Sequence, residues 1–294
     1  MKVDILAFGV HPDDVELGCS GTIVASIAQG KKVAVVDLTR GELGTRGTAE
    51  TRKTEAANAA KVMGVAAREN LEMADGFFQN DEVNIRKVIS VIRKYQPEIV
   101  LCNAPEDRHP DHGRSSKLVT DAAFLAGLRK IETFDNDKAQ EAWRPTYVFH
   151  YIQDRYLKPD FVFDISDYWE KKMETILSYT TQFNSSDNSE PQTYISTPDF
   201  MDTIKSRALM LGKRIGVKYA EGYISTKMIG VTSFDAFIKN VTYQTLPYLK
   251  QYNFCFIITD ILKPAFCFRF DKNEFSLRNV FCFIISKMHS NSWS

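Results

Sequence analysis

Two short segments concentrate histidine and aspartate side chains in this 294-residue chain. His11–Asp14 (HPDD) follows an apolar run at the N-terminus, and Asp107–His112 (DRHPDH) follows another apolar run much later. Imidazole and carboxylate groups are good ligands for a divalent ion such as zinc, and three protein ligands with one open position form the catalytic arrangement. Either segment alone fits an ordinary turn, because Pro-Asp and Asp-Asp pairs are common in turns. Together they favour a metal site.

The two segments offer more groups than one ion needs: His11, Asp13, Asp14, His109, Asp111 and His112. If three of them hold the metal, acids and a histidine remain to move protons. A bound divalent ion lowers the pKa of its water to near ~7. A spare carboxylate at hydrogen-bond distance can then take the proton as hydroxide attacks. These residue types therefore predict metal-assisted hydrolysis.

Alternating strand and helix patterns position both segments. Apolar β-branched runs predict strands, and helically spaced segments between them, several ended by Gly or Pro, predict helices. We expect strands at Val3–Phe8, Lys32–Leu38, Asn70–Met73, Glu98–Asn103, Thr146–Ile152 and Phe161–Ile165, and helices at Gly18–Gln29, Thr48–Met63, Glu82–Tyr95, His112–Gly127, Asp167–Tyr179 and Asp199–Ile215. This succession predicts an α/β fold, a Rossmann-like three-layer α/β/α arrangement with a mainly parallel sheet.

The expected strand order brings the two segments together. In doubly wound sheets the order commonly runs 3-2-1-4, and ligands bind in the crevice at the carboxyl ends of strands 1 and 4. The HPDD segment follows the first expected strand, and the DRHPDH segment follows the fourth. We therefore expect both segments to line one crevice at the C-terminal edge of the sheet.

Composition argues against several functional classes. Lys+Arg and Asp+Glu number 37 each, and this zero net charge argues against nucleic-acid partners and anionic membrane surfaces. No uninterrupted apolar stretch reaches the ~18 residues that span a bilayer, and the N-terminus has no signal-peptide pattern. The five cysteines lack CxxC spacing. We therefore expect free thiols and a cytoplasmic location.

The composition changes near residue 243. The segment 243–294 holds 8 of the 20 Phe and 3 of the 5 Cys, with poor helical and strand periodicity. We expect residues 1–242 to form the α/β domain. The remainder is either a small appendage or a tail outside that folding unit, and we favour the tail because the α/β pattern is complete by about Val231.

The segments around these motifs resemble a known family. HPDD after the first strand and HPDH after the fourth are similar to the motifs of zinc-dependent N-acetylglucosaminyl deacetylases of the PIG-L/LmbE type, over roughly residues 1–240. Three further segments resemble those of the deacetylases of bacillithiol biosynthesis, which remove acetate from N-acetylglucosaminyl-malate: Thr39–Thr48, Glu50–Arg52 and Ser178–Phe183. The resemblance implies an amide hydrolase with one Zn²⁺ per chain, or another divalent ion, and a small sugar-conjugate substrate. It also allows a homo-oligomer.

The resemblance assigns a role to each group of the two motifs. The residues that match zinc ligands are His11, Asp14 and His112. Asp13 matches the general base that activates the metal-bound water. His109 matches the residue that stabilises the oxyanion and protonates the leaving amine, and Asp111 matches the carboxylate that orients His109. An aspartate partner would favour the imidazolium form of His109.

Three further residues are expected to bind substrate. Arg52 can grip a sugar hydroxyl or a carboxylate, because its planar fork suits bidentate recognition, and Arg108 is a weaker candidate. Tyr194 lies in the polar loop 182–196, at a position similar to one that assists the oxyanion in the family. The glycine-rich Thr39–Thr48 loop is either a substrate loop or a flexible connection. For Arg46, within it, we favour a solvated surface side chain.

Other functions fit these residues less well. A dinucleotide-binding oxidoreductase needs G-x-G-x-x-G after the first strand, but Gly9–Asp14 carries Pro and paired acids that would repel phosphate. A metal-dependent phosphoesterase commonly uses two metals, which would leave no base here. The intact set of ligands and base argues against a non-catalytic sugar-binding module. A deacetylase of another N-acetylglucosamine conjugate or of a chitooligosaccharide is the main alternative.

Overall fold

The computed structural model describes residues 1–183 and 190–234. The chain divides into two units, Met1–Gly230 and Val231–Ser294. The predicted boundary near residue 243 and the tail that follows it lie outside the described residues. Cys19 and Cys102 are free and buried, and the other three cysteines lie in the tail. Within the described ranges no helix is long and apolar enough to cross a bilayer.

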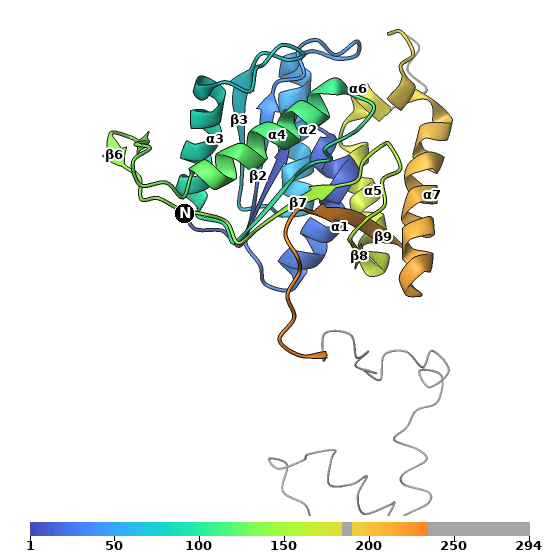
Figure 1. Cartoon of the computed structure of the whole chain (residues 1–294). Coiled ribbons are helices and arrows are strands. Elements are labelled where there is room, and N and C mark those ends of the chain that lie inside the picture. Colours follow the sequence, from blue (N-terminus) through green and yellow to red (C-terminus); the bar gives the residue numbers. More distant parts are fainter. Residues whose placement is uncertain (184–189, 235–294) are drawn as a thin grey trace, which may run out of the picture. The chain divides into compact units, whose positions relative to one another are not determined.

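Seven strands form the main sheet, in the order β3-β2-β1-β4-β7-β9-β8 (Figure 1). They are β1 (Ile5–Gly9), β2 (Val33–Thr39), β3 (Ala67–Met73), β4 (Ile99–Asn103), β7 (Tyr147–Tyr151), β8 (Phe161–Asp164) and β9 (Ala220–Ser225). The strands from β3 to β7 pair in parallel, whereas β9 is antiparallel to both β7 and β8. The predicted 3-2-1-4 order and the mainly parallel sheet are therefore confirmed.

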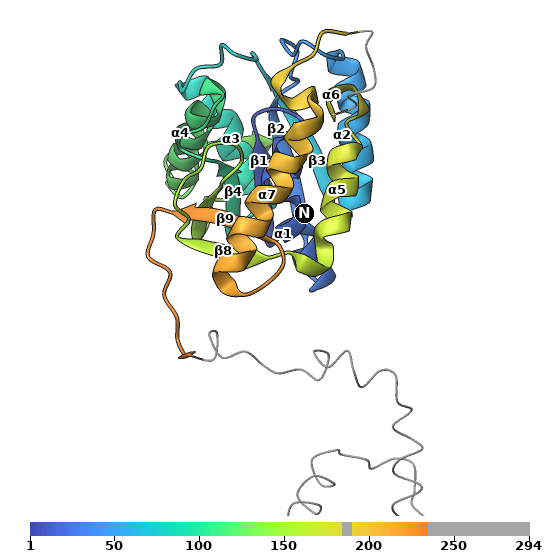
Figure 2. The same cartoon turned by 90° about the vertical axis from the view of Figure 1, so that its right-hand side faces the viewer.

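Helices cover both faces of this sheet (Figures 1 and 2). Helices α3 (Glu82–Tyr95) and α4 (Pro110–Leu125) cover one face. The other face carries α1 (Asp14–Ala28), α2 (Ala49–Met63), α5 (Trp169–Leu177) and α7 (Pro198–Ile215). The remaining elements are short: the hairpin β5 (Phe134–Asp135) and β6 (Lys138–Ala139), α6 (Thr180–Phe183), and the 3₁₀ turns η1 (Ser166–Tyr168) and η2 (Tyr194–Ser196).

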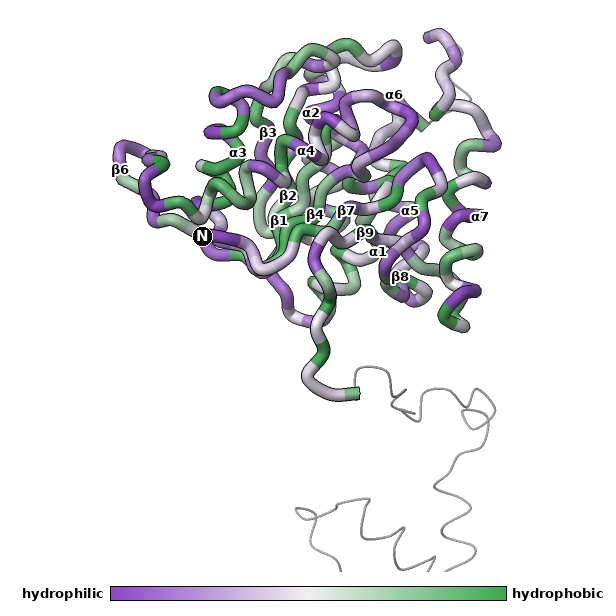
Figure 3. The backbone as a smooth tube through the Cα atoms, viewed as in Figure 1, coloured by the Kyte–Doolittle hydropathy of each residue, from purple (hydrophilic) through white to green (hydrophobic). Residues whose placement is uncertain are grey.

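The central strands are apolar because both of their faces are covered. Every residue of β1 and β2 is buried, and Figure 3 shows the hydrophobic colouring concentrated along β1, β2 and β4. Successive side chains of a strand point to opposite faces. Leu6 and Phe8 accordingly pack in the core beneath α3 and α4, whereas Ile5 and Ala7 pack in the core beneath α1. This packing fixes the edge at which β1 and β4 end.

Two helices begin two or more residues earlier than the sequence pattern predicts. Helix α1 begins at Asp14 instead of Gly18, and α4 begins at Pro110 instead of His112. In α4 this start is favoured by Pro110, because the N–H that proline lacks is not needed in the first turn of a helix. Asp13 is the N-cap residue of α1, and His109 is the N-cap residue of α4. Both motifs thus lie at helix N-termini as well as at strand ends.

Strand β9 was not predicted from the sequence. Its six residues, AEGYIS, mix a carboxylate, a glycine and a serine with apolar side chains, so no strand pattern is visible. The Glu221 carboxylate is buried but accepts hydrogen bonds from Lys172 Nζ (2.8 Å) and from the α1 backbone at Gly21 (3.0 Å) and Thr22 (2.8 Å). Pairing with β7 and β8, together with these bonds, accounts for the strand.

Candidate active site

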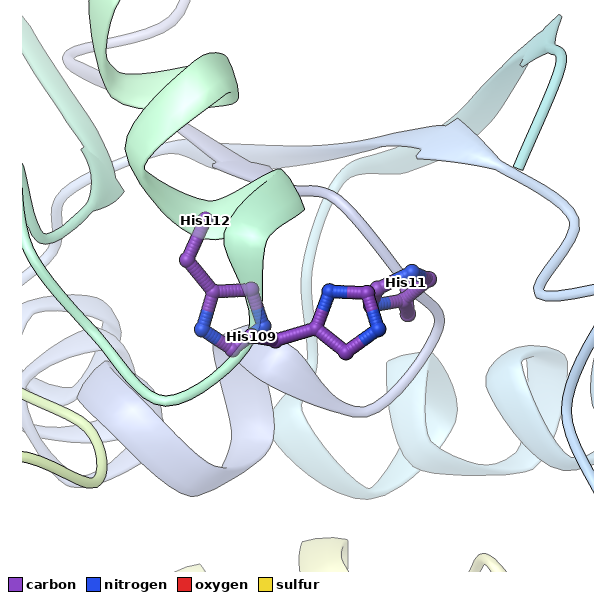
Figure 4. Close-up of side chains that lie close together, drawn as sticks. All are labelled: His11, His109 and His112. Atoms are coloured by element: carbon purple, nitrogen blue, oxygen red, sulfur yellow. The ribbon is translucent and has the colours of Figure 1, made fainter. Parts of the chain in front are cut away.

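Three imidazole rings meet at the C-terminal ends of β1 and β4 (Figure 4). His11 follows β1, while His109 and His112 lie at the start of α4. Their ring centroids are 4.8 Å (His11–His109), 5.5 Å (His109–His112) and 5.9 Å (His11–His112) apart. They line a cavity of about 310 Å³ together with Asp13 and Asp14. The predicted convergence of the two motifs is therefore confirmed.

Asp14 lies at the centre of this group as an ionised carboxylate. Its oxygens accept hydrogen bonds from Val10 N (3.0 Å), His11 N (3.0 Å), Asn103 Nδ2 (3.1 Å) and Gln153 Nε2 (2.7 Å). Burial alone would raise the pKa of Asp14, but His112 and His11 hold that pKa well below its usual value. The carboxylate is therefore a fixed negative charge at the bottom of the cavity.

Each of the two histidines beside Asp14 has a second carboxylate behind it. His112 Nδ1 lies 2.7 Å from Asp107 Oδ2, and its Nε2 lies 3.2 Å from Asp14 Oδ1. His11 Nε2 lies 2.9 Å from Asp75 Oδ1, and its Nδ1 lies 3.7 Å from Asp14 Oδ2. Metal-binding histidines almost always have such a partner on the remote nitrogen, because it fixes the tautomer and orientation of the ring.

This arrangement fits a divalent cation between His11, Asp14 and His112. In this set each histidine approaches Asp14, at 3.7 Å from His11 Nδ1 and 3.2 Å from His112 Nε2. In two different sets all ligand atoms lie within 4.8 Å of one another: His11 with His109 and His112, and His11 with Asp75 and Asp111. Neither of those sets has a central carboxylate, like that of Asp14, that lies between two histidines whose remote nitrogens each contact a further carboxylate. Burial alone would lower the pKa of His112, but Asp14 and Asp107 raise it to about 10. The position therefore attracts positive charge, and the predicted ligand set stays our preferred one.

Asp13 occupies a strained position beside Asp14. As N-cap of α1 it has a φ of 128°, which is uncommon for a residue with a side chain. Its buried carboxylate accepts a 2.8 Å hydrogen bond from Arg52 Nη2. Burial raises the pKa of Asp13 to about 7, although Arg52 lowers it. A group with a pKa near neutrality suits a general base.

Arg52 is therefore a partner of the predicted base, and its guanidinium is enclosed. Its side chain is 6% exposed, and Nη1 lies 2.1 Å from the place where a Cβ on Gly41 would stand. Gly41 also has a φ of +64°, so glycine is required there for both space and conformation. The glycine-rich loop wraps this arginine and is more than a flexible connection.

Asp111 was predicted to orient His109 through its carboxylate, but it does so through its backbone N–H. The backbone N–H of Asp111 donates to His109 Nδ1 (3.2 Å), whereas the Asp111 carboxylate accepts from Gly76 N (2.9 Å) and Arg114 Nη1 (2.6 Å). The reason is that Asp111 lies in the first turn of α4 and its side chain reaches the loop after β3. It orients that loop, and the backbone of α4 orients His109.

The predicted cationic form of His109 is also not favoured. Burial lowers the pKa of His109, and His11 and His112 lower it further. Because Nδ1 accepts an N–H, the proton of the neutral ring is on Nε2. His109 therefore offers one N–H donor to the cavity.

The other two substrate-binding candidates line the same cavity as Arg52. Arg108 and Tyr194 line the cavity and share hydrogen bonds with Asp154. Arg46, which we expected to be solvated, is 2% exposed and donates from Nε to the carbonyl of Thr181 (2.8 Å). It is buried because the chain after α5 folds over the glycine-rich loop, which sequence periodicity does not reveal.

Four residues of the site were missed by sequence reasoning: Asn103, Asp75, Asp107 and Gln153. Each lies at or soon after the C-terminal end of a strand, β4, β3, β4 and β7 respectively. Asp107 also begins the DRHPDH segment. These residues could have been found by looking for polar side chains at the carboxyl ends of neighbouring parallel strands.

Comparison with known proteins identifies the family. Residues 6–123 match the family model described as GlcNAc-PI de-N-acetylase, PIG-L. The uncharacterized deacetylase YaiS of Escherichia coli is 36% identical over 161 residues, which cover 52% of this chain and 83% of that protein. The chain belongs to the PIG-L family. The predicted family, and with it the enzyme class of amide-hydrolysing deacetylases, is confirmed.

Further relatives of the chain span most of the α/β unit. The diacetylchitobiose deacetylase of Thermococcus kodakarensis is 29% identical over 229 residues, 74% of this chain and 81% of that protein. The structure of the conserved protein TT1542 from Thermus thermophilus has a TM-score of 0.70 and 32% identity, covering 78% of this chain and 98% of that one. A 4-oxalmesaconate hydratase of Pseudomonas putida is 26% identical over 186 residues, 58% of this chain and 70% of that protein.

Proposed function

We propose that this PIG-L protein is a zinc-dependent hydrolase that removes acetate from an N-acetylglucosaminyl conjugate, with N-acetylglucosaminyl-malate as the favoured substrate. The observation that carries the proposal is the placement of Asp14 between two histidines, each backed by its own carboxylate. The same cavity holds a carboxyl group with a pKa near neutrality and a separate N–H donor. These are the groups that amide hydrolysis needs.

The residues divide the work of the reaction. A divalent ion held by His11, Asp14 and His112 would polarise the amide carbonyl and acidify a water. Asp13 accepts the proton of the attacking water, and Arg52 keeps Asp13 ionised and oriented. The Nε2–H of His109 donates to the amide oxygen as negative charge develops on it.

The leaving amine also needs a proton. Neutral imidazole is a poor acid, so the lowered pKa of His109 argues against the predicted proton transfer from that ring. Asp13 holds the proton after the attack of water and can return it to the amine as the C–N bond breaks. We therefore infer that Asp13 acts first as base and then as acid, while His109 acts as a hydrogen-bond donor.

Two observations support the choice of substrate. Most residues that line the cavity of about 310 Å³ carry polar side chains, and its size fits the lower range of small-molecule sites. A T. kodakarensis relative is named for deacetylation of diacetylchitobiose, which supports an N-acetylglucosamine unit. The malate aglycone rests on the resemblance of the 39–52 and 178–183 segments. A chitooligosaccharide is the alternative, and a phosphoesterase would need a second metal set and a base. The cytoplasmic location stays a prediction.

An acetate-release assay tests the proposal. Protein stripped with a chelator and reloaded with one equivalent of Zn²⁺ should release acetate from N-acetylglucosaminyl-malate faster than from N-acetylglucosamine or N,N′-diacetylchitobiose. Asp13→Asn, loaded in the same way, serves as the inactive control. Because one relative is a hydratase, water addition to an unsaturated dicarboxylic acid should be measured in parallel. Hydration without acetate release from any of the three sugars would refute the deacetylase function.

A further inference from the structure

Three side chains from separate segments contact one another at the mouth of the cavity. Arg108 Nε donates to Asp154 Oδ2 (2.8 Å), and the Tyr194 hydroxyl donates to Asp154 Oδ1 (3.1 Å). The Arg108 guanidinium also lies over the Tyr194 ring, 4.4 Å from its centroid. Both oxygens of Asp154 are thus used, and the guanidinium is held in its plane by stacking and by an ion pair.

This geometry leaves the terminal nitrogens of Arg108 available. Among residues 1–183 and 190–234, only the backbone N–H and Nε of Arg108 have hydrogen-bond acceptors, and its side chain is 44% exposed. Arg52, in contrast, is 6% exposed and paired with Asp13. Of these two arginines that line the cavity, Arg108 is the one that can receive a carboxylate through its planar fork.

One carboxylate connects this cluster to the catalytic group. Asp107 Oδ1 accepts the backbone N–H groups of Arg108 and Arg155, both at 2.8 Å. Asp107 Oδ2 holds His112 Nδ1 at 2.7 Å. The segments that carry Arg108 and Asp154 are therefore fixed relative to the predicted metal ligand His112. A substrate bound by Arg108 would keep a defined distance from the reacting centre.

The glycine-rich loop adds an apolar contact to the same cavity. Leu43 lines it and is 60% exposed. The N–H of Leu43 donates to Asp75 Oδ2 (3.0 Å), and the other oxygen of Asp75 holds His11. The wall of the cavity thus offers both an apolar side chain on an anchored backbone and a fixed cation to the part of the substrate beyond the sugar.

We propose that Arg108, Asp154 and Tyr194 form an anion-binding rim that recognises the carboxylate of the aglycone and sets substrate specificity. Arg108 binds the carboxylate, and Asp154 is a positioning residue that acts through Arg108 and Tyr194. The Tyr194 ring supports the guanidinium, and its hydroxyl is occupied by Asp154 instead of reaching the amide oxygen. This inference rests on the proposed deacetylase function and specifies its substrate class.

Steady-state kinetics with two substrates test the rim in the zinc-loaded enzyme. N-acetylglucosaminyl-malate carries the carboxylates, and methyl N-acetylglucosaminide lacks them. Arg108→Gln should raise KM for the malate conjugate by about 10- to 100-fold, the loss expected when a hydrogen-bonded charge pair is removed. Its kcat for that conjugate and both constants for the methyl glycoside should stay within about twofold. Arg86→Gln, which removes an exposed arginine that bonds Glu82 and the carbonyl of Glu132 and does not line the cavity, is the matched control and should change the constants for neither substrate.

Two further variants separate positioning from catalysis. Asp154→Asn should raise KM for the malate conjugate alone, and the double variant with Arg108→Gln should be no worse than Arg108→Gln, because the two residues act as one unit. Tyr194→Phe keeps the ring and should leave kcat unchanged for both substrates. A fall in kcat for both would instead assign Tyr194 to the oxyanion and overturn its place in the rim.

The outcomes distinguish this inference from the proposed function. Equal KM increases for the two substrates in Arg108→Gln would overturn carboxylate recognition while the deacetylase function stands. No acetate from either substrate with the unaltered zinc-loaded enzyme would refute both.

Discussion

Replacing Arg52 by glutamine should change the pH dependence of the reaction more than its maximum rate. Arg52 Nη2 and Asp13 Oδ2 are 2.8 Å apart, and both side chains are 6% exposed. Burial raises the pKa of Asp13 to about 7 even though Arg52 lowers it. Without the guanidinium, the pKa of Asp13 should rise further, because burial then acts with less opposition.

The size of the effect follows from the geometry. A unit charge this close, in a site with little solvent screening, lowers a carboxyl pKa by about 1 to 3 units. Asp13 must be ionised to act as a base, so activity is lost as the pH falls through its pKa. The acidic limb of the kcat/KM profile should therefore move up by about 1 to 3 pH units in Arg52→Gln. A bound cation lowers the Asp13 pKa in both enzymes and leaves this difference in place.

The assay is kcat/KM for acetate release from pH 5 to 10 with zinc-loaded protein. At the acidic end the variant should lose about 10- to 1000-fold, and it should approach the unaltered enzyme at the alkaline end. Arg40→Gln, an exposed arginine of the same loop, is the control and should leave the limb in place. A uniform loss at every pH, with KM raised throughout, would refute this reasoning and return Arg52 to the substrate-binding role predicted from the sequence.

Three other predictions concern the metal site and the chain length. Asp13→Asn should keep the metal while kcat falls by about 10²- to 10⁴-fold, whereas Asp14→Asn should lose the metal. If metal analysis of the two proteins gave the reverse result, Asp13 would be the ligand and Asp14 the base. Asp107→Asn should weaken metal binding by about 10- to 100-fold, because it orients His112; unchanged affinity in a chelator competition would contradict this. A chain that ends at Thr242 should still unfold cooperatively and bind one equivalent of metal, and a large fall in its melting temperature would show that the tail belongs to the fold.

Much of the site could be predicted because strand ends are visible in the sequence. Apolar runs before HPDD and DRHPDH marked β1 and β4, and the carboxyl ends of neighbouring parallel strands share one edge. The residues of both motifs therefore had to approach one another. The strand order confirmed this expectation, and the family comparison agrees with the motif resemblance.

The sequence by itself determined which residue types meet at the C-terminal edge of β1 and β4, because local hydrophobic patterning sets the strands and topology sets their order. Only the tertiary structure decided which side chain pairs with which. Arg52 faces Asp13, the backbone of Asp111 holds His109, and Asp107 holds His112. Such pairs depend on loop conformation and side-chain direction between distant segments, and no periodicity in the sequence encodes either of these.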